Sequence, residues 1–271
     1  MVMITSRANE RVKQIRALKN RRDRDESGTF FAEGARVLQA ALETGAVIDL
    51  VVFAPDRLSP EEDAALRGLM ERHLPFLEVS ADVYDSLTFR EESQSLGAVV
   101  RQRWETLSLD TKGHRCWVAL QDIQHPGNLG AIIRTSDAIG GDGVILSGRA
   151  TDPYHPIAVR GSLGTVFSQR IVRAAPADFA RWVRDSGYGV VGTSPAGEKD
   201  YRKADYASRP VVLIMGSERA GLSREQKALC DAVVRIPMAG YVDSLNLSVA
   251  SALVLYEVLR QVERSGSSAS G

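Results

Sequence analysis

Short amphipathic helices alternate with short apolar strands through the first hundred residues. Residues 9–22 predict a helix, because Val12, Ile15 and Leu18 share one stripe and basic side chains surround it. Gly45 is placed to end the next helix as its C-cap. The predicted elements are helix 33–43, strand 47–53, helix 60–72, strand 76–79, helix 81–88 and strand 96–101. They make a small α/β unit.

A second series begins at Trp117, after the stretch 106–113, which has few large apolar residues. Its predicted elements are strand 117–123, helix 128–140, strand 143–147, helix 177–186, strands 188–193 and 211–215, helix 223–230, strand 232–236 and a long helix 244–263. Strands that alternate with helices predict an α/β fold with a mostly parallel sheet covered on both faces. We expect domains at 1–105 and 114–262, a linker at 106–113 and a disordered tail at 263–271.

Composition excludes several classes of protein. The chain of 271 residues is 44% hydrophobic and 25% charged, which is typical of a globular protein and excludes a mainly disordered or fibrous chain. No apolar run approaches the roughly 20 residues of a membrane span. The N-terminus carries no hydrophobic signal region, so we expect a cytoplasmic protein. Cys116 and Cys230 show no zinc or redox spacing and are expected to be core residues, and the scattered histidines predict no metal site.

Charge is balanced overall but not locally. Lys and Arg together number 34, as do Asp and Glu, and a formal charge of zero argues against a nucleic-acid partner. Residues 1–24, however, hold eight basic side chains against two acidic ones, whereas 25–105 hold seven against sixteen. The basic segment is either a solvated helix face or an element that contacts RNA phosphates. The candidate RNA-binding residues are Arg7, Arg11, Lys13, Arg16, Lys19 and Arg22.

Glycines at the predicted strand ends mark the candidate chemistry. Neither GxGxxG nor a P-loop is present. Instead, the turn after strand 117–123 places Asn128 between Gly127 and Gly130, and Arg134 follows one helical turn after Gly130. Such a turn lets backbone approach a ligand closely, and a helix N-terminus favours anions. The alternative is a helix-capping Asn and a surface Arg.

Two further segments have the same character. An apolar strand ends at Gly216, Ser217 and Glu218, with Gly221 three residues on. Another ends at Ile236, and Ser244–Ser248 then opens the last helix. Ligands in open α/β sheets bind beyond the carboxyl ends of the strands. The alternatives are a solvated loop carboxylate and ordinary helix capping by Ser244 or Asn246.

Taken together, the three segments resemble the motifs of the SpoU family, ribose 2′-O-methyltransferases of RNA within the SPOUT superfamily. The first reads NxGxxxR (Asn128, Gly130, Arg134) and the second is an apolar strand followed by GSExxG (216–221). The third reads IPMxGxxxSLNxSxA (236–250). The resemblance covers about residues 114–262. FFAEG at 30–34, after a basic helix, also resembles the substrate-binding domain often attached to this family.

The resemblance implies a deep trefoil knot in the second domain, S-adenosylmethionine as cofactor, and a homodimer with the site near the subunit interface. It implies that the N-terminal domain is a ribosomal-protein-like α/β domain that binds RNA. The residues it assigns to the cofactor are Gly216, Ser217, Ile236, Met238 and Leu245. The residues it assigns to catalysis are Arg134, Asn128, Glu218, Ser244 and Asn246.

For the reaction we expect attack of a ribose 2′-hydroxyl on a methyl sulfonium. Arg134 matches the family's catalytic arginine, either as general base or as a phosphate clamp; a guanidinium is almost never neutral, which favours the clamp. We expect ribosomal RNA of the large subunit (23S) as substrate, in some members with antibiotic resistance. The alternatives are tRNA, a SPOUT enzyme that methylates a base, and a non-catalytic RNA-binding or ribosome-assembly protein.

Overall fold

The computed structural model describes residues 2–89, 94–110, 113, 115–217 and 220–268. The chain divides into two compact units. Unit 1 comprises Met1–Arg103 and Asp152–Ser168, and unit 2 comprises Trp104–Thr151 and Gln169–Gly271. The chain therefore leaves unit 2 after Thr151, contributes seventeen residues to unit 1, and returns at Gln169.

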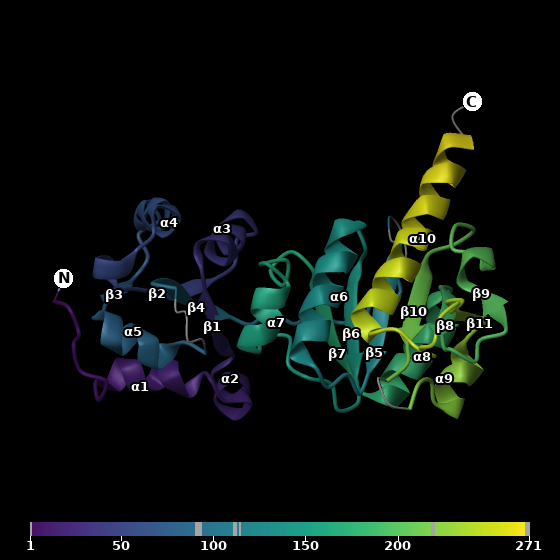
Figure 1. The fold of residues 1–271 in the computed structure, drawn as a ribbon, viewed down its shortest axis with the longest axis horizontal. Coiled ribbons are helices and arrows are strands. Elements are labelled where there is room, and N and C mark those ends of the chain that lie inside the picture. The colour runs from purple at the N-terminus through teal and green to yellow at the C-terminus, as the bar shows by residue number, and fades with distance from the viewer. Residues whose placement is uncertain (1, 90–93, 111–112, 114, 218–219, 269–271) are drawn as a thin grey trace. The chain divides into compact units, whose positions relative to one another are not determined.

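Unit 1 contains a mixed sheet that has four strands among the described residues, in the order β1-β4-β2-β3. β4 pairs antiparallel with β1 and β2, and β3 joins β2 in parallel. Its elements (Figure 1) are α1 (Glu10–Ala17), α2 (Arg21–Ser27), β1 (Thr29–Glu33), α3 (Ala35–Glu43), β2 (Ile48–Phe53), the short helix η1 (Pro55–Arg57), α4 (Pro60–Met70), β3 (Phe76–Glu78), α5 (Ala81–Leu87), β4 (Leu96–Arg101) and α7 (Pro156–Gly161).

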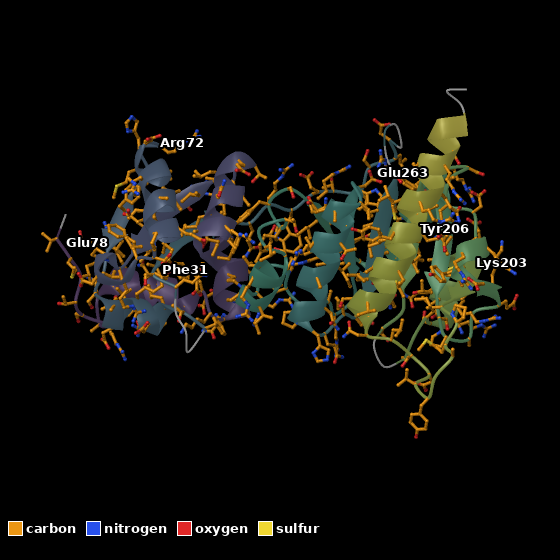
Figure 2. The ribbon with its side chains drawn as sticks, turned by 45° about the horizontal axis from the view of Figure 1, so that its top comes forward. Phe31, Arg72, Glu78, Lys203, Tyr206 and Glu263 are labelled. Atoms are coloured by element: carbon orange, nitrogen blue, oxygen red, sulfur yellow. The ribbon has the colours of Figure 1, made fainter. Side chains whose placement is uncertain are left out.

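The stripe predicted for the first helix does face the core. Val12 and Ile15 of α1 are buried in one cluster with Phe31 of β1, which lies inside the unit, whereas Arg72 lies on its surface (Figure 2). Burying a valine or isoleucine side chain stabilises the fold by about 1.5–3 kcal/mol. The apolar stripe thus fixes which side of α1 turns inward and leaves its basic side chains outside.

A buried ion pair attaches Asp152–Ser168 to unit 1. Arg24 Nε lies 2.7 Å from Asp152 Oδ2, and the two side chains are 1% and 3% exposed. Arg24 Nη1 also donates to the carbonyls of Leu18 and Lys19, at 2.7 and 2.9 Å. The ring of Tyr154 packs on that of Phe30, with centroids 4.7 Å apart. These contacts join segments 128 residues apart in sequence.

Unit 2 contains an all-parallel sheet with seven strands in the described chain, in the order β7-β6-β5-β10-β8-β11-β9. Its elements are β5 (Cys116–Gln121), α6 (Pro126–Ala138), β6 (Gly143–Ser147), β7 (Arg170–Ala174), α8 (Pro176–Ser186), β8 (Gly189–Thr193), β9 (Lys199–Asp200), the short helix η2 (Tyr201–Lys203), β10 (Val211–Met215), α9 (Arg224–Leu229), β11 (Ala232–Arg235) and α10 (Leu247–Ser268).

Both faces of this sheet are covered, as predicted. Trp117 of β5 packs with Phe179 and Trp182 of α8 on one face. Side chains alternate along a strand, so Val118 and Leu120 point to the other face, where they too are buried. α6 and α10 contact each other and run side by side across the sheet (Figure 1).

Among the residues that the structure describes, no helix combines the length and the apolar character that a membrane span needs.

The last helix is longer than the sequence predicts. The sequence predicts a helix that ends at residue 263, whereas α10 continues to Ser268, and the disordered tail stays a prediction. Adding a residue to a helix that is already formed costs little, even where few apolar side chains remain to be buried. Gln261 also holds this end, since its Oε1 accepts the backbone N–H of Tyr206 at 3.1 Å and its Nε2 donates to the carbonyl of Ala204 at 3.0 Å (Tyr206 is labelled in Figure 2).

Other differences follow from tertiary structure. The helix predicted over 9–22 is two helices, because the backbone at Asn20 is extended (φ −89°, ψ 140°) and starts α2. β1, α7, β7 and β9 were not predicted as elements. The expected limits 1–105, 106–113 and 114–262 differ from the two units in the segment Asp152–Ser168, which packs in unit 1. Those domain limits stay a prediction.

Candidate active site

The three candidate segments meet at one edge of the unit 2 sheet. β10 pairs in parallel with β5 on one side and with β8 on the other, and β11 pairs with the far side of β8. The carboxyl ends of parallel strands lie at the same edge, so the chain after each of these strands emerges there. The sheet order thus brings together residues that are more than a hundred positions apart in the sequence.

A cavity of about 660 Å³ lies at this edge. Its walls include every residue that the sequence assigned to the cofactor: Gly216, Ser217, Ile236, Met238 and Leu245. Three of the predicted catalytic residues, Asn128, Ser244 and Asn246, line the same cavity. One space therefore gathers residues of all three motifs.

Close backbone packing shapes the loop after β10. Ser217 and Gly221 exchange backbone hydrogen bonds of 2.9 and 3.0 Å, and Gly221 has a φ of +65°, which favours glycine. A Cβ on Gly216 would lie 2.5 Å from the carbonyl carbon of Gly221. The loop then ends at a capping box in which Ser223 and Gln226 each accept the other's backbone N–H, at the start of α9. Both glycines are therefore required by the turn itself.

An amide pair links the first motif to the third. Asn246 Nδ2 donates to Asn128 Oδ1 at 3.1 Å. Asn246 Oδ1 accepts the backbone N–H of Ser248 at 2.9 Å and its hydroxyl at 2.6 Å, so this amide caps the start of α10. Capping also orients the amide, because its oxygen is held by Ser248 and its nitrogen must face Asn128. Asn246 thus fulfils the capping alternative raised from the sequence and also lines the cavity, and its catalytic role stays a prediction.

Arg134 differs in position from the three predicted catalytic residues that line the cavity. Arg134 is exposed on α6 and, within the described residues, neither lines the cavity nor has a hydrogen-bond or ion-pair partner. It is six positions from Asn128, which puts it about 120° around the helix. Glu218 lies outside the described residues. Ser244 is exposed, and its hydroxyl donates to Asp243 Oδ1 at 3.2 Å.

Sequence reasoning missed one wall of the cavity. Thr193, Ser194, Pro195 and Ala196 line it at the end of β8, because that strand lies between β10 and β11. The hydroxyl of Thr193 donates to Met215 Sδ at 3.3 Å, which holds it against β10. His125, which precedes α6, is also in the lining. Only the strand order, which the sequence pattern left open, could have placed this segment in the site.

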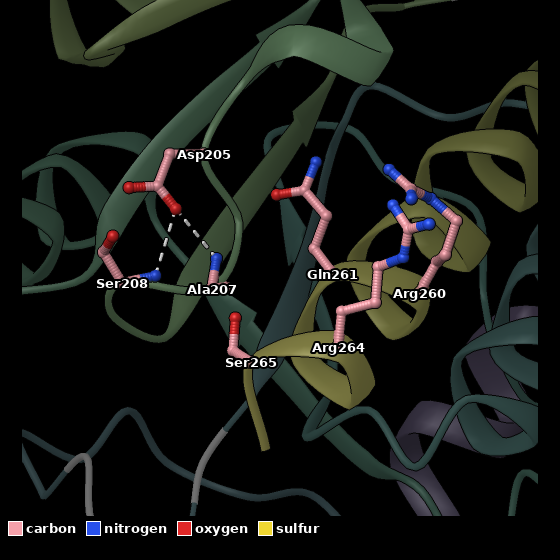
Figure 3. Close-up of a pocket in the computed structure, with 7 residues that line it drawn as sticks. All are labelled: Asp205, Ala207, Ser208, Arg260, Gln261, Arg264 and Ser265. Atoms are coloured by element: carbon pink, nitrogen blue, oxygen red, sulfur yellow. Dashed lines mark hydrogen bonds between the residues drawn. The ribbon is translucent and has the colours of Figure 1, made fainter. Parts of the chain in front are cut away.

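A second cavity, of about 460 Å³, lies along the last turns of α10 and contains no predicted site residue. In Figure 3, Arg260, Gln261 and Arg264 face it from the helix, and Asp205 lies across from them. The Asp205 carboxylate accepts the backbone N–H groups of Ala207 and Ser208, both at 3.0 Å, so it serves to shape the loop. The cavity is distinct from the one that gathers the motifs.

The candidate RNA-binding residues lie in unit 1, and several have partners there. Arg7 pairs with Asp82, Lys13 with Glu10 and Arg22 with Glu26 on the surface of the unit. Arg16 and Lys19 are half-buried and donate to neighbouring groups, whereas the side chain of Arg11 is exposed with no hydrogen-bond or ion-pair partner among the described residues. Arg24, counted in the basic segment, is taken up in the buried pair with Asp152.

Comparison with protein families identifies the chain. Residues 115–256 match the SpoU rRNA methylase family, and residues 9–98 match the MRM3-like substrate binding domain. Residues 115–256 make up more than half of the chain and include the cavity and all three motifs. The chain belongs to the SpoU rRNA methylase family.

Named relatives span nearly the whole chain. A 23S rRNA (uridine(2479)-2′-O)-methyltransferase of Streptomyces viridochromogenes is 35% identical over 95% of this chain and 92% of its own length. An rRNA methyltransferase from Sinorhizobium meliloti, solved with AdoMet bound, has a TM-score of 0.87 at 40% identity, covering 96% of this chain and 98% of that one. The SpoU methyltransferase AviRb from Streptomyces viridochromogenes with AdoMet has a TM-score of 0.82 at 33% identity, covering 93% and 98%. The fold class predicted from the sequence is confirmed.

Proposed function

We propose that this chain methylates a ribose 2′-hydroxyl of 23S ribosomal RNA, with S-adenosylmethionine as the methyl donor. The observation that carries the proposal is the hydrogen bond between Asn246 and Asn128, which joins two motifs beside a cavity lined by all three. Relatives named as 23S rRNA 2′-O-methyltransferases and related structures with AdoMet bound support both the reaction and the cofactor.

The cavity suits this cofactor chemically. Ile236, Met238 and Leu245 offer apolar surface for an adenine ring, and Thr193 and Ser217 offer hydroxyls for the polar groups of the cofactor. The absence of a side chain at Gly216 lets the loop fold closely, with its backbone forming part of the wall. Bound S-adenosylmethionine supplies a methyl group on a sulfonium, which is already a good electrophile.

The chain's own task is to orient the hydroxyl and accommodate its proton. Asn128 and Asn246 hold each other in fixed orientations at the cavity, which suits them to position the ribose. We assign Ser244 and Glu218 to the same positioning, Ser244 because it lines the cavity and Glu218 by its place in the second motif.

Arg134 is proposed as a phosphate clamp that also stabilises the developing negative charge on oxygen. Its exposed position on α6, outside the cavity lining, suits contact with the RNA backbone more than proton abstraction inside the site. A guanidinium stays charged in proteins and can donate two parallel hydrogen bonds to phosphate.

The Arg134→Ala variant tests this role. We expect methyl transfer to ribosomal RNA to be abolished, because the clamp acts on the substrate, and the affinity for S-adenosylmethionine to stay within about twofold of the parent. Isothermal titration calorimetry measures the affinity, and transfer of labelled methyl groups measures activity. A large loss of cofactor affinity would contradict the assignment.

A homodimer is also proposed, with α10 in the interface. Val249, Leu253 and Tyr256 are 48%, 38% and 53% exposed and recur at helical spacing along this helix. Large apolar side chains that are exposed in one stripe are typical of a self-complementary surface. The trefoil knot implied by the family resemblance likewise stays a prediction.

Alternatives differ in what they predict for a single assay. A tRNA methyltransferase would label tRNA, an enzyme acting on a base would leave the ribose unprotected from alkali, and a binding or assembly protein would transfer no label. We place the activity in the cytoplasm with the ribosome. Protection of the ribosome from an antibiotic is a further expectation, which drug susceptibility of cells that carry and lack the protein would test.

A further inference from the structure

An exposed aromatic ring in unit 1 lies between two nitrogen-bearing side chains. Phe89, just after α5, is 45% exposed, whereas Phe30 and Phe31 in the same unit are 0% and 5% exposed. The Nζ of Lys19 lies 5.4 Å from the centre of its ring. The imidazole of His155 lies 5.6 Å away, with the two ring planes at 55°. Phe89 therefore contributes little to the core and presents much of its surface to solvent.

Hydrogen bonds hold both side chains that flank the Phe89 ring. Lys19 Nζ donates to the carbonyl of Thr88 at 2.6 Å. His155 Nδ1 accepts the backbone N–H of Ile157 at 3.2 Å, which caps the start of α7. Three residues before His155, the buried pair of Asp152 with Arg24 fixes this segment on unit 1. In the cluster of Lys19, Phe89 and His155, which we call the Phe89 platform, hydrogen bonds thus hold the two side chains that flank the ring.

The imidazole of the platform has a hydrogen-bond donor available. Because Nδ1 of His155 accepts a hydrogen bond, the neutral ring carries its proton on Nε2. In the part of the chain that the structure describes, Nε2 has no hydrogen-bond partner. Burial and the nearby Arg24 lower the pKa of His155, which favours this neutral ring at pH 7. Neutral imidazole presents both an aromatic edge and one N–H.

Positive charge accompanies the exposed ring. Besides Lys19, Arg16 lies near the end of α5, where its Nη2 donates to Ser86 Oγ at 3.0 Å. Proteins that bind single-stranded RNA combine an aromatic face, on which a base stacks, with cations that neutralise the adjoining phosphates. Arg16 of α1, Lys19 just after it and the ring after α5 come from different segments and make that combination together.

We propose that the Phe89 platform stacks an unpaired base of the RNA substrate, with Lys19 near the adjoining phosphate and His155 at the edge of the base. The inference rests on the proposed function for the identity of the RNA, but not for the contact itself. It places recognition of the base in unit 1. Part of the platform, His155, comes from the segment Asp152–Ser168 in the middle of the chain.

Binding of a short RNA tests the platform directly. The probe is a ten-residue unstructured oligoribonucleotide with a central 2-aminopurine, whose fluorescence is quenched when the base stacks. The full chain is expected to bind and quench it. Phe89→Leu should weaken binding on the order of tenfold and remove the quench, because an aliphatic side chain cannot stack, whereas Phe89→Trp should preserve both.

Matched controls separate stacking from general packing. Met70→Ala truncates a side chain that is 46% exposed in the same unit and should change neither signal. His155→Asn keeps a capping oxygen for α7 but removes the ring, and should reduce the affinity several-fold. Far-UV circular dichroism melts verify that each variant is folded. If Phe89→Leu and Phe89→Trp both bind and quench like the parent, the proposal is overturned.

Methyl transfer to ribosomal RNA distinguishes this inference from the proposed function. If the parent enzyme methylates rRNA and the Phe89→Leu variant has an unchanged KM for rRNA, the platform is refuted and the proposed function is unaffected. A raised KM with a nearly unchanged kcat supports the platform. If the parent enzyme methylates no RNA but quenches the probe, and the quench depends on Phe89, the proposed function is refuted and the platform is unaffected.

Discussion

Replacing Asp152 by Asn should destabilise unit 1 without removing any of its apolar contacts. The change keeps a side-chain oxygen for the backbone N–H of Tyr154 but leaves the guanidinium of Arg24 buried without its counter-charge. Breaking a buried ion pair by removing one partner costs about 3–5 kcal/mol. Two backbone carbonyls still accept from Arg24, so we expect the lower half of that range. With a urea dependence of about 1.5 kcal/mol per molar, the unfolding midpoint falls by about 2–3 M.

Two optical signals locate the effect. The tryptophans, Trp104, Trp117 and Trp182, all belong to unit 2, so their fluorescence follows that unit, whereas far-UV circular dichroism follows both. We expect Asp152→Asn to shift an early dichroism transition and to leave the tryptophan transition nearly unchanged. That outcome would also confirm that Asp152–Ser168 stabilises unit 1.

A surface pair provides the control. Asp82→Asn breaks the ion pair with Arg7, whose side chains are 54% and 67% exposed (Arg7 and Asp82), and should cost less than about 1 kcal/mol. The double change Arg24→Met with Asp152→Leu should recover most of the lost stability, because an apolar pair of similar volume leaves no buried charge. If Asp152→Asn costs no more than Asp82→Asn, the reasoning about the buried pair is refuted.

Three further predictions concern unit 2. Gly216→Ala should reduce S-adenosylmethionine affinity at least tenfold, since its Cβ would meet the backbone of Gly221. The control Gly68→Ala in α4 of unit 1, with no atom within 4 Å of the added Cβ, should bind normally in calorimetry. Asn246→Asp keeps the capping oxygen of α10 but loses the donor to Asn128. The free energy of unfolding should therefore stay within about 1 kcal/mol of the parent, while methyl transfer is lost. Full activity would exclude the amide pair from the mechanism. Burial raises the pKa of Cys230 to about 11. Labelling of this thiol at pH 8 should therefore be slow in the native protein, accelerate as the pH rises towards 11, and be fast in urea. Rapid labelling of the native protein at pH 8 would contradict that burial.

The motifs could be read from the sequence because their constraints are local. Gly221 is needed for a positive φ, Gly216 for close backbone approach, and Asn246 for a helix cap, and each leaves a residue type at a fixed spacing. Buried strands such as β10, where all five residues are buried, likewise leave an apolar run. These features predicted the fold class and the strand ends, and the family resemblance that the motifs carry predicted eight of the twenty residues that line the cavity.

Features that depend on distant contacts left no such pattern. Nothing near Asp152 in the sequence indicates that its partner is Arg24, so the passage of this segment into unit 1 could not be predicted. The wall formed after β8 follows from strand order, and the outward position of Arg134 on α6 follows from how that helix packs against α10. The run TFFAE of β1 has no clear alternation of apolar and polar residues, so the sequence pattern does not predict this strand.

The central claim is tested most directly by incubating the protein with methyl-labelled S-adenosylmethionine and separate pools of unmodified 23S rRNA and tRNA, then mapping the product by alkaline hydrolysis. A 2′-O-methyl group blocks cleavage at the modified nucleotide. We predict label in 23S rRNA only, at one position that resists alkali. Label in tRNA, a normal hydrolysis ladder at the labelled nucleotide, or no transfer to either RNA would contradict the account.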